Sequence, residues 1–539
     1  MTKQYQSHLA RASASAGMYT VDNAVILAAG EASRFAPLSF EKPKPMFEVR
    51  GEVLIDRMIR QLHEVGVSQV YVVVGYMAEA FDYLKDVPGV EVVFNPDYAN
   101  MNNFASLYAV ADKLANSYIC SADQYYTENI FASQLDAPYC SAVRSTEPGG
   151  ERILVVDGML CEVGVIESNL RLQGPIFLNE DYSKRLTDIL AQAYKDPNCA
   201  HMLWDELLAA HLSEFPLNVK IYEPGIIYEF NYLNDLRGFD TDFFENVDST
   251  ILDNICNTLQ CEREDISGVY PFEAGLSNLS VMFEANENMY VYRHPGAGTN
   301  EIINRKHEAQ ALELAKELGL DSTYLFADPQ VGWKISYFVD GCVPFDYENP
   351  DHVKQALSLV HKLHTSGVST EATFDYLALA KDMEAALNTQ GWEWPEDYAE
   401  LRDTIMHLDS LMEQDRGELV FCHNDFYGPN ILVTKDDMQL IDWEYAGMCD
   451  YANDLGSFVA QGSGYDVEKT IEMLPLYYGR KPSPEEIRHV LGAVGLVGYF
   501  WYVWSQYKAS LGNPMDEWAC VWYDAAKVFS AEALTYYQE

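Results

Sequence analysis

Three side chains in the C-terminal part of the sequence have the types and spacing that phosphoryl transfer needs. In "FCHNDFYGPNIL", residues 421–432, Asn430 follows Asp425 by five positions, and "LIDWEY" then places Asp442 after a strand-like run. A carboxylate can orient a hydroxyl group and accept its proton, while amide and carboxylate oxygens bind Mg²⁺. Asp and Asn are also common loop residues, because their side chains bond nearby backbone groups. The ordered set predicts Asp425 as the base and Asn430 and Asp442 as Mg²⁺ ligands.

A second set of such residues lies near the N-terminus. The stretch "LAAGEASRF" puts small residues and Gly30 directly after a strand-like run, where a nucleotide can approach backbone N–H groups closely. Arg34 offers a phosphate clamp, and "EKPKPM" adds the positive charge of Lys44. Asp123 ends the strand-like run "SYICSAD" and is a candidate Mg²⁺ ligand, although a single Asp there is more often a helix cap or loop residue. Together these residues predict a nucleotide site.

The composition excludes several classes of partner. The 539 residues include 36 Lys and Arg against 82 Asp and Glu, a formal net charge of −46. Such a field repels nucleic acid and anionic membrane surfaces, so any NTP site must supply local cations or Mg²⁺. The ten cysteines form no Cys-x-x-Cys pair, no run of about 18 apolar residues suggests a membrane span, and no basic-then-apolar leader is visible. We therefore expect a cytoplasmic protein without membrane insertion; composition does not predict its oligomeric state.

The elements that must position the N-terminal residues follow a βαβ rhythm. A buried-strand run at 24–29 leads through an amphipathic segment to "VYVVVGY" at 70–76, and further strand-like runs end in polar residues. Strand, helix and strand at this spacing predict a mostly parallel sheet, which binds ligands at the carboxyl ends of its strands. We expect a flexible arm over 1–21, this α/β domain over 22–238, and a helical linker over 239–265.

The remaining residues, 266–539, predict a small β-rich lobe followed by a large helical lobe. Three short strands and a helix precede "WKISYFVDG", and long helical segments fill most of the rest. Arg293 lies on a small-lobe strand, where a cation that clamps a nucleotide belongs, and Glu308 in the next helix is placed to pair with it. This α+β bilobal layout is that of a kinase.

The N-terminal pieces "LAAGEASRF", "KPKP", "VVVGY", "FNPDYANMNNFASLY" and "SADQYYTEN" resemble the nucleotidyltransferases that join an NTP to a phosphorylated small molecule. They look most like the CTP:phosphocholine cytidylyltransferase branch, which implies a Rossmann-like domain. The resemblance implies that Asp123 holds Mg²⁺, and that Asn231 stands where the family would lead us to expect Asp as the second metal ligand. By the same resemblance, the nucleotide and its phosphates are bound by Leu27, Ala28, Ala29, Gly30, Arg34 and Lys44, with Asn103 and Ser106 nearby.

The C-terminal pieces "GLSNLSVMF", "YRHPGAGTNEIINRKHEAQAL", "HKLHTSG", "CHNDFYGPNIL", "IDWEYAG" and "CDYANDLGSF" resemble the choline/ethanolamine kinases and their aminoglycoside-phosphotransferase relatives. The resemblance implies a protein-kinase-like fold. It places Ser277 and Asn278 in the loop over the ATP phosphates, Arg293 on ATP, and Glu308 beside Arg293. For His361 and His364 we prefer helix packing and loop support to acid–base work.

Aromatic residues near the C-terminus suggest how a quaternary ammonium group is recognised. Trp501 and Trp504 are three positions apart and share a helix face, which usually means core packing. They also lie where choline kinases carry cage tryptophans, and a trimethylammonium group, lacking N–H donors, is bound by aromatic faces. We therefore expect Trp501, Trp504 and Tyr523 to enclose choline, with Glu444 as an acidic neighbour.

The activities expected for the two halves would catalyse consecutive reactions. A kinase would convert choline and ATP to phosphocholine, and a cytidylyltransferase would convert phosphocholine and CTP to CDP-choline and pyrophosphate, each with Mg²⁺. One alternative keeps both reactions but acts on ethanolamine, or gives the first domain an aminoalkylphosphonate. Another makes one half a nucleotide-binding module without turnover, an idea that Asn231 favours for the N-terminal half.

Overall fold

The computed structural model describes residues 18–145, 152–272, 279–296 and 303–538. The chain divides into two compact units, Met1–Glu273 with Val281–Asn286 and Ala274–Ser280 with Glu287–Glu539. Each unit has its own buried core. Residues 1–17 of the predicted flexible arm lie outside the described residues, whereas β1 (Tyr19–Thr20) pairs antiparallel with β9 (Gln134–Leu135), so the end of the predicted arm is a strand of the first unit. The predicted domain boundaries stay a prediction.

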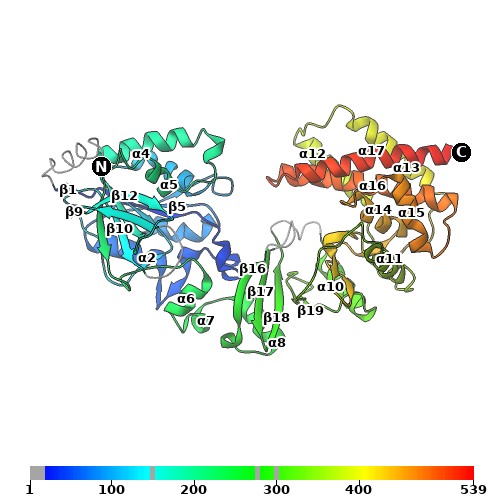
Figure 1. Cartoon of the computed structure of the whole chain (residues 1–539), viewed down its shortest axis with the longest axis horizontal. Helices are drawn as coiled ribbons and strands as arrows, with labels where there is room; N and C mark the ends of the chain where they lie inside the picture. Colours follow the sequence, from blue (N-terminus) through cyan, green and yellow to red (C-terminus); the bar gives the residue numbers. More distant parts are fainter. Residues whose placement is uncertain (1–17, 146–151, 273–278, 297–302, 539) are drawn as a thin grey trace. The chain divides into compact units, whose positions relative to one another are not determined.

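The first unit is built on a nine-stranded sheet with the order β11-β12-β14-β10-β13-β7-β2-β5-β6 (Figure 1). Its centre is parallel, because β2 pairs in parallel with both β5 and β7, and β5 pairs in parallel with β6. β13 is antiparallel to both its neighbours, and β10 is parallel to β14. The strands are β2 (Asn23–Ala28), β5 (Val70–Val74), β6 (Val90–Phe94), β7 (Ser117–Ser121), β10 (Tyr139–Arg144), β11 (Arg152–Val156), β12 (Met159–Gly164), β13 (Leu170–Leu178) and β14 (Asn218–Tyr222).

Helices cover both faces of this sheet, which explains why β2 is apolar at every position after Asn23. Ala24, Ile26 and Ala28 pack into one core with α2 (Leu54–Glu64), while Val25 and Leu27 face a second core. That second core is formed with α3 (Asn103–Tyr108), α4 (Glu180–Ala193) and α5 (Trp204–Ala210). A strand buried on both faces needs apolar side chains at every position. In Figure 1, α2 and α4 lie on opposite sides of the sheet.

The polar residues of the first site follow from strand register. Leu27 on β2 pairs with Ser121 on β7, and the N–H of Ala122 donates to the carbonyl of Leu27 at 3.1 Å. Because parallel strands end at the same edge, the loop after β2 and Asp123 after β7 meet there. A short pair beyond this edge, β8 (Gln124–Tyr126) with β15 (Ile227–Glu229), brings residues 227–231 beside Asp123. The helices α6 (Leu233–Phe239), α7 (Phe243–Asn246) and α8 (Thr250–Leu259) follow.

A five-stranded sheet has the order β16-β17-β18-β20-β19. Its strands are β16 (Ser267–Phe272), β17 (Leu279–Ala285), β18 (Asn288–His294), β19 (Tyr324–Ala327) and β20 (Lys334–Tyr337). In the second unit, α10 (Arg305–Glu317) follows β18, and β18 pairs antiparallel with β20 so that Arg293 lies directly opposite Lys334. Side chains opposite each other in such a pair share one face of the sheet, so these two cations are neighbours.

The rest of the second unit is mainly helical around one large core. Its helices are α11 (Pro350–His364), α12 (Tyr376–Thr389), α13 (Tyr398–Met412), α14 (Tyr451–Ala460), α15 (Val467–Tyr478), α16 (Pro484–Ser510) and α17 (Asp516–Gln538). The predicted catalytic motifs adjoin two small antiparallel strand pairs, β21 (Val420–Cys422) with β24 (Gly447–Cys449) and β22 (Ile431–Val433) with β23 (Met438–Leu440). The long helices α16 and α17 run side by side (Figure 1).

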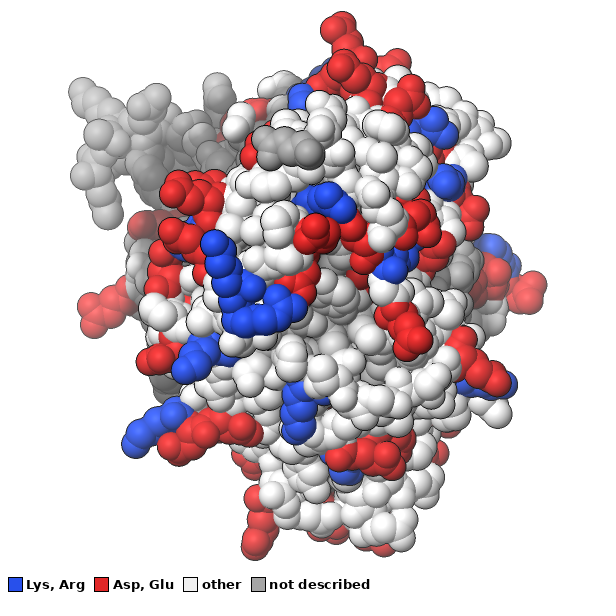
Figure 2. Space-filling model, turned by 90° about the vertical axis from the view of Figure 1, so that its right-hand side faces the viewer, with Lys and Arg blue, Asp and Glu red and all other residues white. Residues whose placement is uncertain are grey.

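The charged side chains on the surface agree with the acidic composition of the chain. On the face of the described chain that Figure 2 shows, Lys and Arg side chains stand among Asp and Glu side chains and form no continuous basic area. Among the described residues, no helix combines the length and the apolar character needed to cross a membrane.

Candidate functional site

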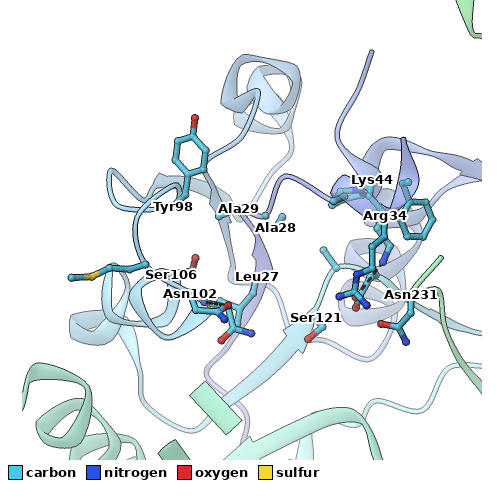
Figure 3. Close-up of a pocket in the computed structure, with 18 residues that line it drawn as sticks. Leu27, Ala28, Ala29, Arg34, Lys44, Tyr98, Asn102, Ser106, Ser121 and Asn231 are labelled. Carbon is cyan, nitrogen blue, oxygen red and sulfur yellow. Dashed lines mark hydrogen bonds and ion pairs between the residues drawn. The ribbon is translucent and has the colours of Figure 1, made fainter. Parts of the chain in front are cut away.

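The first candidate site is a cavity of about 310 Å³ at the carboxyl ends of β2 and β7. Each residue that the sequence assigned to a role in this domain lines it: Leu27, Ala28, Ala29, Gly30, Arg34, Lys44, Asn103, Ser106, Asp123 and Asn231. Arg34, Lys44 and Asn231 stand on one side of the end of β2, and Tyr98, Asn102 and Ser106 stand on the other (Figure 3). The cavity therefore has a cationic end and an end lined by neutral polar and aromatic groups.

Lys44 and Asp123 form an ion pair in the cationic end. The Nζ of Lys44 lies 3.3 Å from Oδ2 of Asp123 and also donates to the carbonyl of Phe230. Burial lowers the pKa of Lys44, and the neighbouring Asp123 carboxylate opposes that effect. The other oxygen of Asp123, Oδ1, is buried and has no hydrogen-bond partner among the described residues. A buried carboxylate oxygen without a partner is costly, so it is available to a cation.

Glu229 is a second carboxylate at this end that the sequence analysis missed. It lies on β15 opposite Gln124, and it accepts hydrogen bonds from the amides of Gln124 and Asn231, both at 3.3 Å. Burial, together with the negative charge of Asp123, raises the pKa of Glu229 to about 7. The sequence analysis looked for a carboxylate at position 231, whereas the structure places one two residues earlier.

The other end of the cavity is shaped by close packing. A Cβ on Gly75 would lie 2.5 Å from Cβ of Tyr98 and 2.9 Å from the carbonyl oxygen of Ala29, so only glycine lets these two segments approach. Ser106 accepts from the amide of Asn95 at 3.0 Å, and Oδ1 of Asn103 accepts from the N–H of Trp204 at 2.8 Å. Asn103 therefore also ties α3 to the start of α5.

The second candidate site surrounds Asp425. Both of its carboxylate oxygens accept amide hydrogen bonds at 2.8 Å, Oδ1 from Gln461 and Oδ2 from Asn430. Burial raises the pKa of Asp425 to about 8; the hydrogen bond from Gln461 opposes this rise and the charge of Asp442 adds to it. A carboxylate held between two donors, with a pKa near neutrality, suits a general base. Gln461 directly follows α14, as its C-cap residue, and lies outside the motifs quoted from the sequence.

A buried carboxylate on α14 holds the loop that carries Asp425. Asp454 accepts from the backbone N–H groups of His423 at 2.8 Å and Asn424 at 2.6 Å. Its Oδ2 also lies 2.9 Å from Nε2 of His364, whose Nδ1 lies 2.8 Å from the hydroxyl of Tyr477. His364 thus supports the loop, as expected.

Carboxylates and cations form a buried cluster beside Asp425, made of Arg293, Glu308, Lys334, Asp442 and Glu444. Carboxylate oxygens of Glu308, Asp442 and Glu444 lie within 4.8 Å of one another, close enough to hold a cation. Burial opposes ionisation of Asp442, yet Lys334 and Arg293 together hold its pKa below the ordinary value. For Glu444, burial and the charge of Asp442 raise the pKa to about 7. The N–H of Ile441 donates to the carbonyl of Asn430 at 2.9 Å, which keeps Asn430 next to this cluster.

The predicted aromatic pair lies on α16 among further aromatic rings. Trp501 and Trp504 are 3% and 6% exposed, with ring centroids 5.2 Å apart in an edge-on arrangement. Trp522 of α17 lies 5.9 Å from Trp501 and 6.2 Å from Trp504, and Tyr445 lies 5.7 Å from Trp501. These tryptophans are packed as a core is packed, although Tyr445 connects them to the charged cluster through its neighbour Glu444.

Comparisons with known proteins agree with this division of the chain. The family model of the MobA-like NTP transferase domain matches residues 24–209, and that of choline/ethanolamine kinase matches residues 269–490. The chain is 33% identical over 217 residues to the choline-phosphate cytidylyltransferase of Streptococcus pneumoniae. The aligned region covers 40% of this chain and 95% of that protein. The chain belongs to the MobA-like NTP transferase family, joined to a choline/ethanolamine kinase domain. The predicted fold class and both predicted resemblances are confirmed.

Two other proteins show similarity to one half each. The 2-aminoethylphosphonate cytidylyltransferase of Lancefieldella rimae is 32% identical over 225 residues, covering 40% of this chain and 92% of that protein. The solved structure of choline kinase LicA from Streptococcus pneumoniae has 22% identity and a TM-score of 0.45, covering 52% of this chain and 98% of that chain.

Some predicted residues of the kinase domain are placed differently from expectation. Tyr523 does not stand beside Trp501 and Trp504: its ring packs on Tyr502 at 4.4 Å and its hydroxyl donates to Asp397 at 2.7 Å. Successive helical residues point about 100° apart, so it is Trp522 that faces the tryptophans of α16. Ser277 and Asn278 lie outside the described residues.

Proposed function

We propose that this chain phosphorylates choline with ATP and then transfers CMP from CTP to phosphocholine, releasing CDP-choline and pyrophosphate. The observation that carries this proposal is the joining, in one chain, of a choline/ethanolamine kinase match to a domain 33% identical to a choline-phosphate cytidylyltransferase. The product of the second half is then the substrate of the first half. We also propose a cytoplasmic location and the predicted domain boundaries 22–238 and 266–539.

For cytidylyl transfer, the cationic end of the first cavity receives the phosphates of CTP. Arg34 and Lys44 bind them together with the backbone of Leu27 to Gly30, and the nucleoside lies toward Tyr98 and Ser106. A phosphate oxygen of phosphocholine attacks the α-phosphorus of CTP as its bond to the bridging oxygen breaks, and pyrophosphate leaves. Such a displacement needs in-line positioning and positive charge more than it needs proton transfer.

Asp123 is the residue that we propose to hold Mg²⁺ in the first site, with Glu229 and Asn231 beside it. The buried, unpartnered Oδ1 of Asp123 fits this role, as does the proximity of a second carboxylate. When bound, Mg²⁺ offsets negative charge on the reacting phosphates. Glu229 would then supply the charge that Asn231, as a neutral amide, lacks.

For phosphorylation, Asp425 accepts the proton of the choline hydroxyl as that oxygen attacks the γ-phosphorus of ATP and ADP leaves. Gln461 and Asn430 orient the carboxylate through their 2.8 Å hydrogen bonds. Asn430 and Asp442 are the proposed Mg²⁺ ligands, and the carboxylate group around Asp442 fits a cation. Bound Mg²⁺ would neutralise charge on the β- and γ-phosphates.

We propose that the trimethylammonium group of choline binds against Trp501 and Trp504, with Trp522 in place of the predicted Tyr523. The aromatic faces supply cation–π attraction. Glu444 supplies a negative charge nearby, because it precedes Tyr445, whose ring lies against Trp501. Because both tryptophans are buried, choline binding requires their side chains to rearrange.

A second candidate substrate follows from the second relative. The 32% identity to a 2-aminoethylphosphonate cytidylyltransferase is almost as high as the first relative's 33%, so the first domain is a candidate for an aminoalkylphosphonate. Ethanolamine is the corresponding candidate for the kinase domain, since the matching family model includes ethanolamine kinases.

The test uses the full-length protein with ATP, CTP and Mg²⁺, and follows ADP, pyrophosphate and CDP-choline separately. We expect choline to give all three products, and phosphocholine with CTP alone to give pyrophosphate and CDP-choline. Ethanolamine and 2-aminoethylphosphonate are run in parallel arms at equal concentration. Higher kcat/KM with either of these would replace choline as the substrate. Absence of pyrophosphate with every acceptor would make the first half a binding module.

A further inference from the structure

Two cations lie side by side in the kinase domain, and the sequence motifs accounted for only one of them. Arg293 on β18 and Lys334 on β20 are direct register partners on one face of the sheet. Asp442 bridges them, because its Oδ1 lies 3.2 Å from Nη1 of Arg293 and 3.2 Å from Nζ of Lys334. The question is which of the two can leave its carboxylates for a ligand.

Both terminal nitrogens of Arg293 are committed to the protein, while its buried Nε has no hydrogen-bond partner among the described residues. Its Nη1 donates to Asp442 at 3.2 Å and to Glu444 at 3.3 Å, while its Nη2 donates to Glu308 and to the carbonyl of Gly332 at 3.4 Å. A planar guanidinium has four N–H bonds on these two atoms, so each already has an acceptor. Moving Arg293 toward a ligand would strip the buried carboxylates of Glu308 and Glu444 of a partner.

Lys334 is committed far less. Its Nζ bonds Asp442 at 3.2 Å and lies 3.9 Å from Oε1 of Glu308, which is beyond hydrogen-bond distance. A lysine ammonium carries three N–H groups on a stem that can rotate, so it can turn to a new acceptor without losing its position on the strand. The side chains of Lys334 and Asp442 are 12% and 31% exposed, against 5% for Arg293 and 2% for Glu308. The open side of the cluster is therefore the side of Lys334.

We infer that Lys334 is the cation that binds the phosphates of ATP, and that Arg293 is a positioning residue that holds Glu308, Asp442 and Glu444 in place. This inference rests on the proposed kinase function of the domain. It also changes the role that the sequence motifs suggested for Arg293. If Asp442 holds a divalent cation, Lys334 would be released from this carboxylate and could donate to phosphate oxygens instead.

The test measures binding of ATP and of adenosine, each with Mg²⁺, to the full-length protein by calorimetry. Lys334→Met keeps the apolar stem and removes the charge, so we expect ATP to bind about 10- to 150-fold more weakly, the range for a hydrogen bond to a charged group. Adenosine binding should change less than twofold. Lys334→Arg should restore part of the ATP affinity, and Lys316→Met, an exposed lysine on α10, should change neither.

The Arg293→Lys variant gives the opposite signature if Arg293 is a positioning residue. We expect its unfolding temperature to fall, and ATP and adenosine to weaken by the same factor. Unchanged ATP affinity in Lys334→Met, or an equal loss for ATP and adenosine, would overturn the assignment. So would selective loss of ATP affinity in Arg293→Lys at an unchanged unfolding temperature.

These outcomes are separate from those of the proposed function. A wild-type protein that binds ATP but phosphorylates neither choline nor ethanolamine refutes the kinase proposal, while the binding measurements still decide on Lys334. A wild-type protein that binds no ATP refutes both.

Discussion

Replacing Gln461 by Leu tests whether kinase activity depends on the orientation of the Asp425 carboxylate. The amide of Gln461 donates to Oδ1 of Asp425 and to the hydroxyl of Ser457, both at 2.8 Å. Leucine removes the donor at a similar side-chain volume, so Asp425 keeps only the hydrogen bond from Asn430 on Oδ2. A hydrogen bond to a charged group contributes about 1.5–3 kcal/mol. If that energy orients the base in the transition state, kcat falls about 10- to 150-fold.

The pH profile gives a second, independent signature. The hydrogen bond from Gln461 lowers the pKa of Asp425 against the raising effect of burial. The base works in its ionised form, so activity rises with pH through this pKa. Removing the donor raises the pKa further, and the acid limb of kcat/KM moves to higher pH.

ADP release would be followed with a coupled assay, together with the KM values of ATP and choline and the unfolding temperature. Gln414 is an exposed glutamine in the turn after α13, so Gln414→Leu is the matched control and should behave as wild type. An unchanged kcat and an unshifted acid limb in Gln461→Leu would refute the reasoning. A lower unfolding temperature with kcat intact would make Gln461 a packing residue only.

Three other perturbations have defined outcomes. Glu229→Gln should raise the Mg²⁺ concentration needed for half-maximal pyrophosphate release, because the first site loses its second carboxylate; an unchanged requirement would remove Glu229 from the metal site. Trp504→Leu should raise the choline KM about thirtyfold, because one desolvated cation–π contact contributes about 2 kcal/mol. Lower thermal stability with an unchanged choline KM would mean that Trp504 only packs in the core. Asp415 has a pKa that Arg488, by hydrogen bonds at 2.7 and 2.8 Å, holds below its ordinary value. A carboxylate whose pKa is depressed by folding stabilises the protein above its unfolded-state pKa, and this stabilisation is lost as the pH falls through its folded-state pKa. Asp415→Asn should therefore lower the unfolding temperature at pH 7 and make that temperature fall less steeply in acid, as measured by scanning calorimetry.

Local motifs predicted the parts of the sites that are continuous in sequence. The loop after β2 and the loop from His423 to Asn430 each carry several chemistry-bearing residues within about ten positions, so their types and spacing were readable. The meeting of Asp123 with that first loop was also predictable, because parallel strands end at the same edge of a sheet.

The site residues that the sequence did not predict reach the site from segments far away in the chain. Lys334 stands alone in "WKISYF", and only the pairing of β18 with β20 puts it beside Arg293. Gln461 reaches Asp425 from the far end of α14, 36 positions later. The sequence named Tyr523 as the third aromatic wall and did not single out Trp522, whose ring lies beside Trp501 and Trp504. Two adjacent aromatic residues on one helix differ by about 100° in direction, and the apolar pattern of α17 did not fix which of them faces α16.

One arrangement shared by both proposed nucleotide sites explains how a strongly acidic chain could bind nucleotides. A net charge of −46 repels ATP and CTP at long range, so each site needs a cation that the surrounding carboxylates do not cancel permanently. In both sites the proposed metal ligand is paired with a lysine: Asp123 with Lys44 at 3.3 Å, and Asp442 with Lys334 at 3.2 Å. Without nucleotide, each lysine is the cationic partner of a partly exposed carboxylate, 32% exposed for Asp123 and 31% for Asp442. In the proposed mechanism, Asp123 and Asp442 would hold the divalent cation of a bound nucleotide, and Lys44 and Lys334 would then turn to its phosphates. Two unrelated folds would thus meet the same electrostatic requirement with the same exchange of partners.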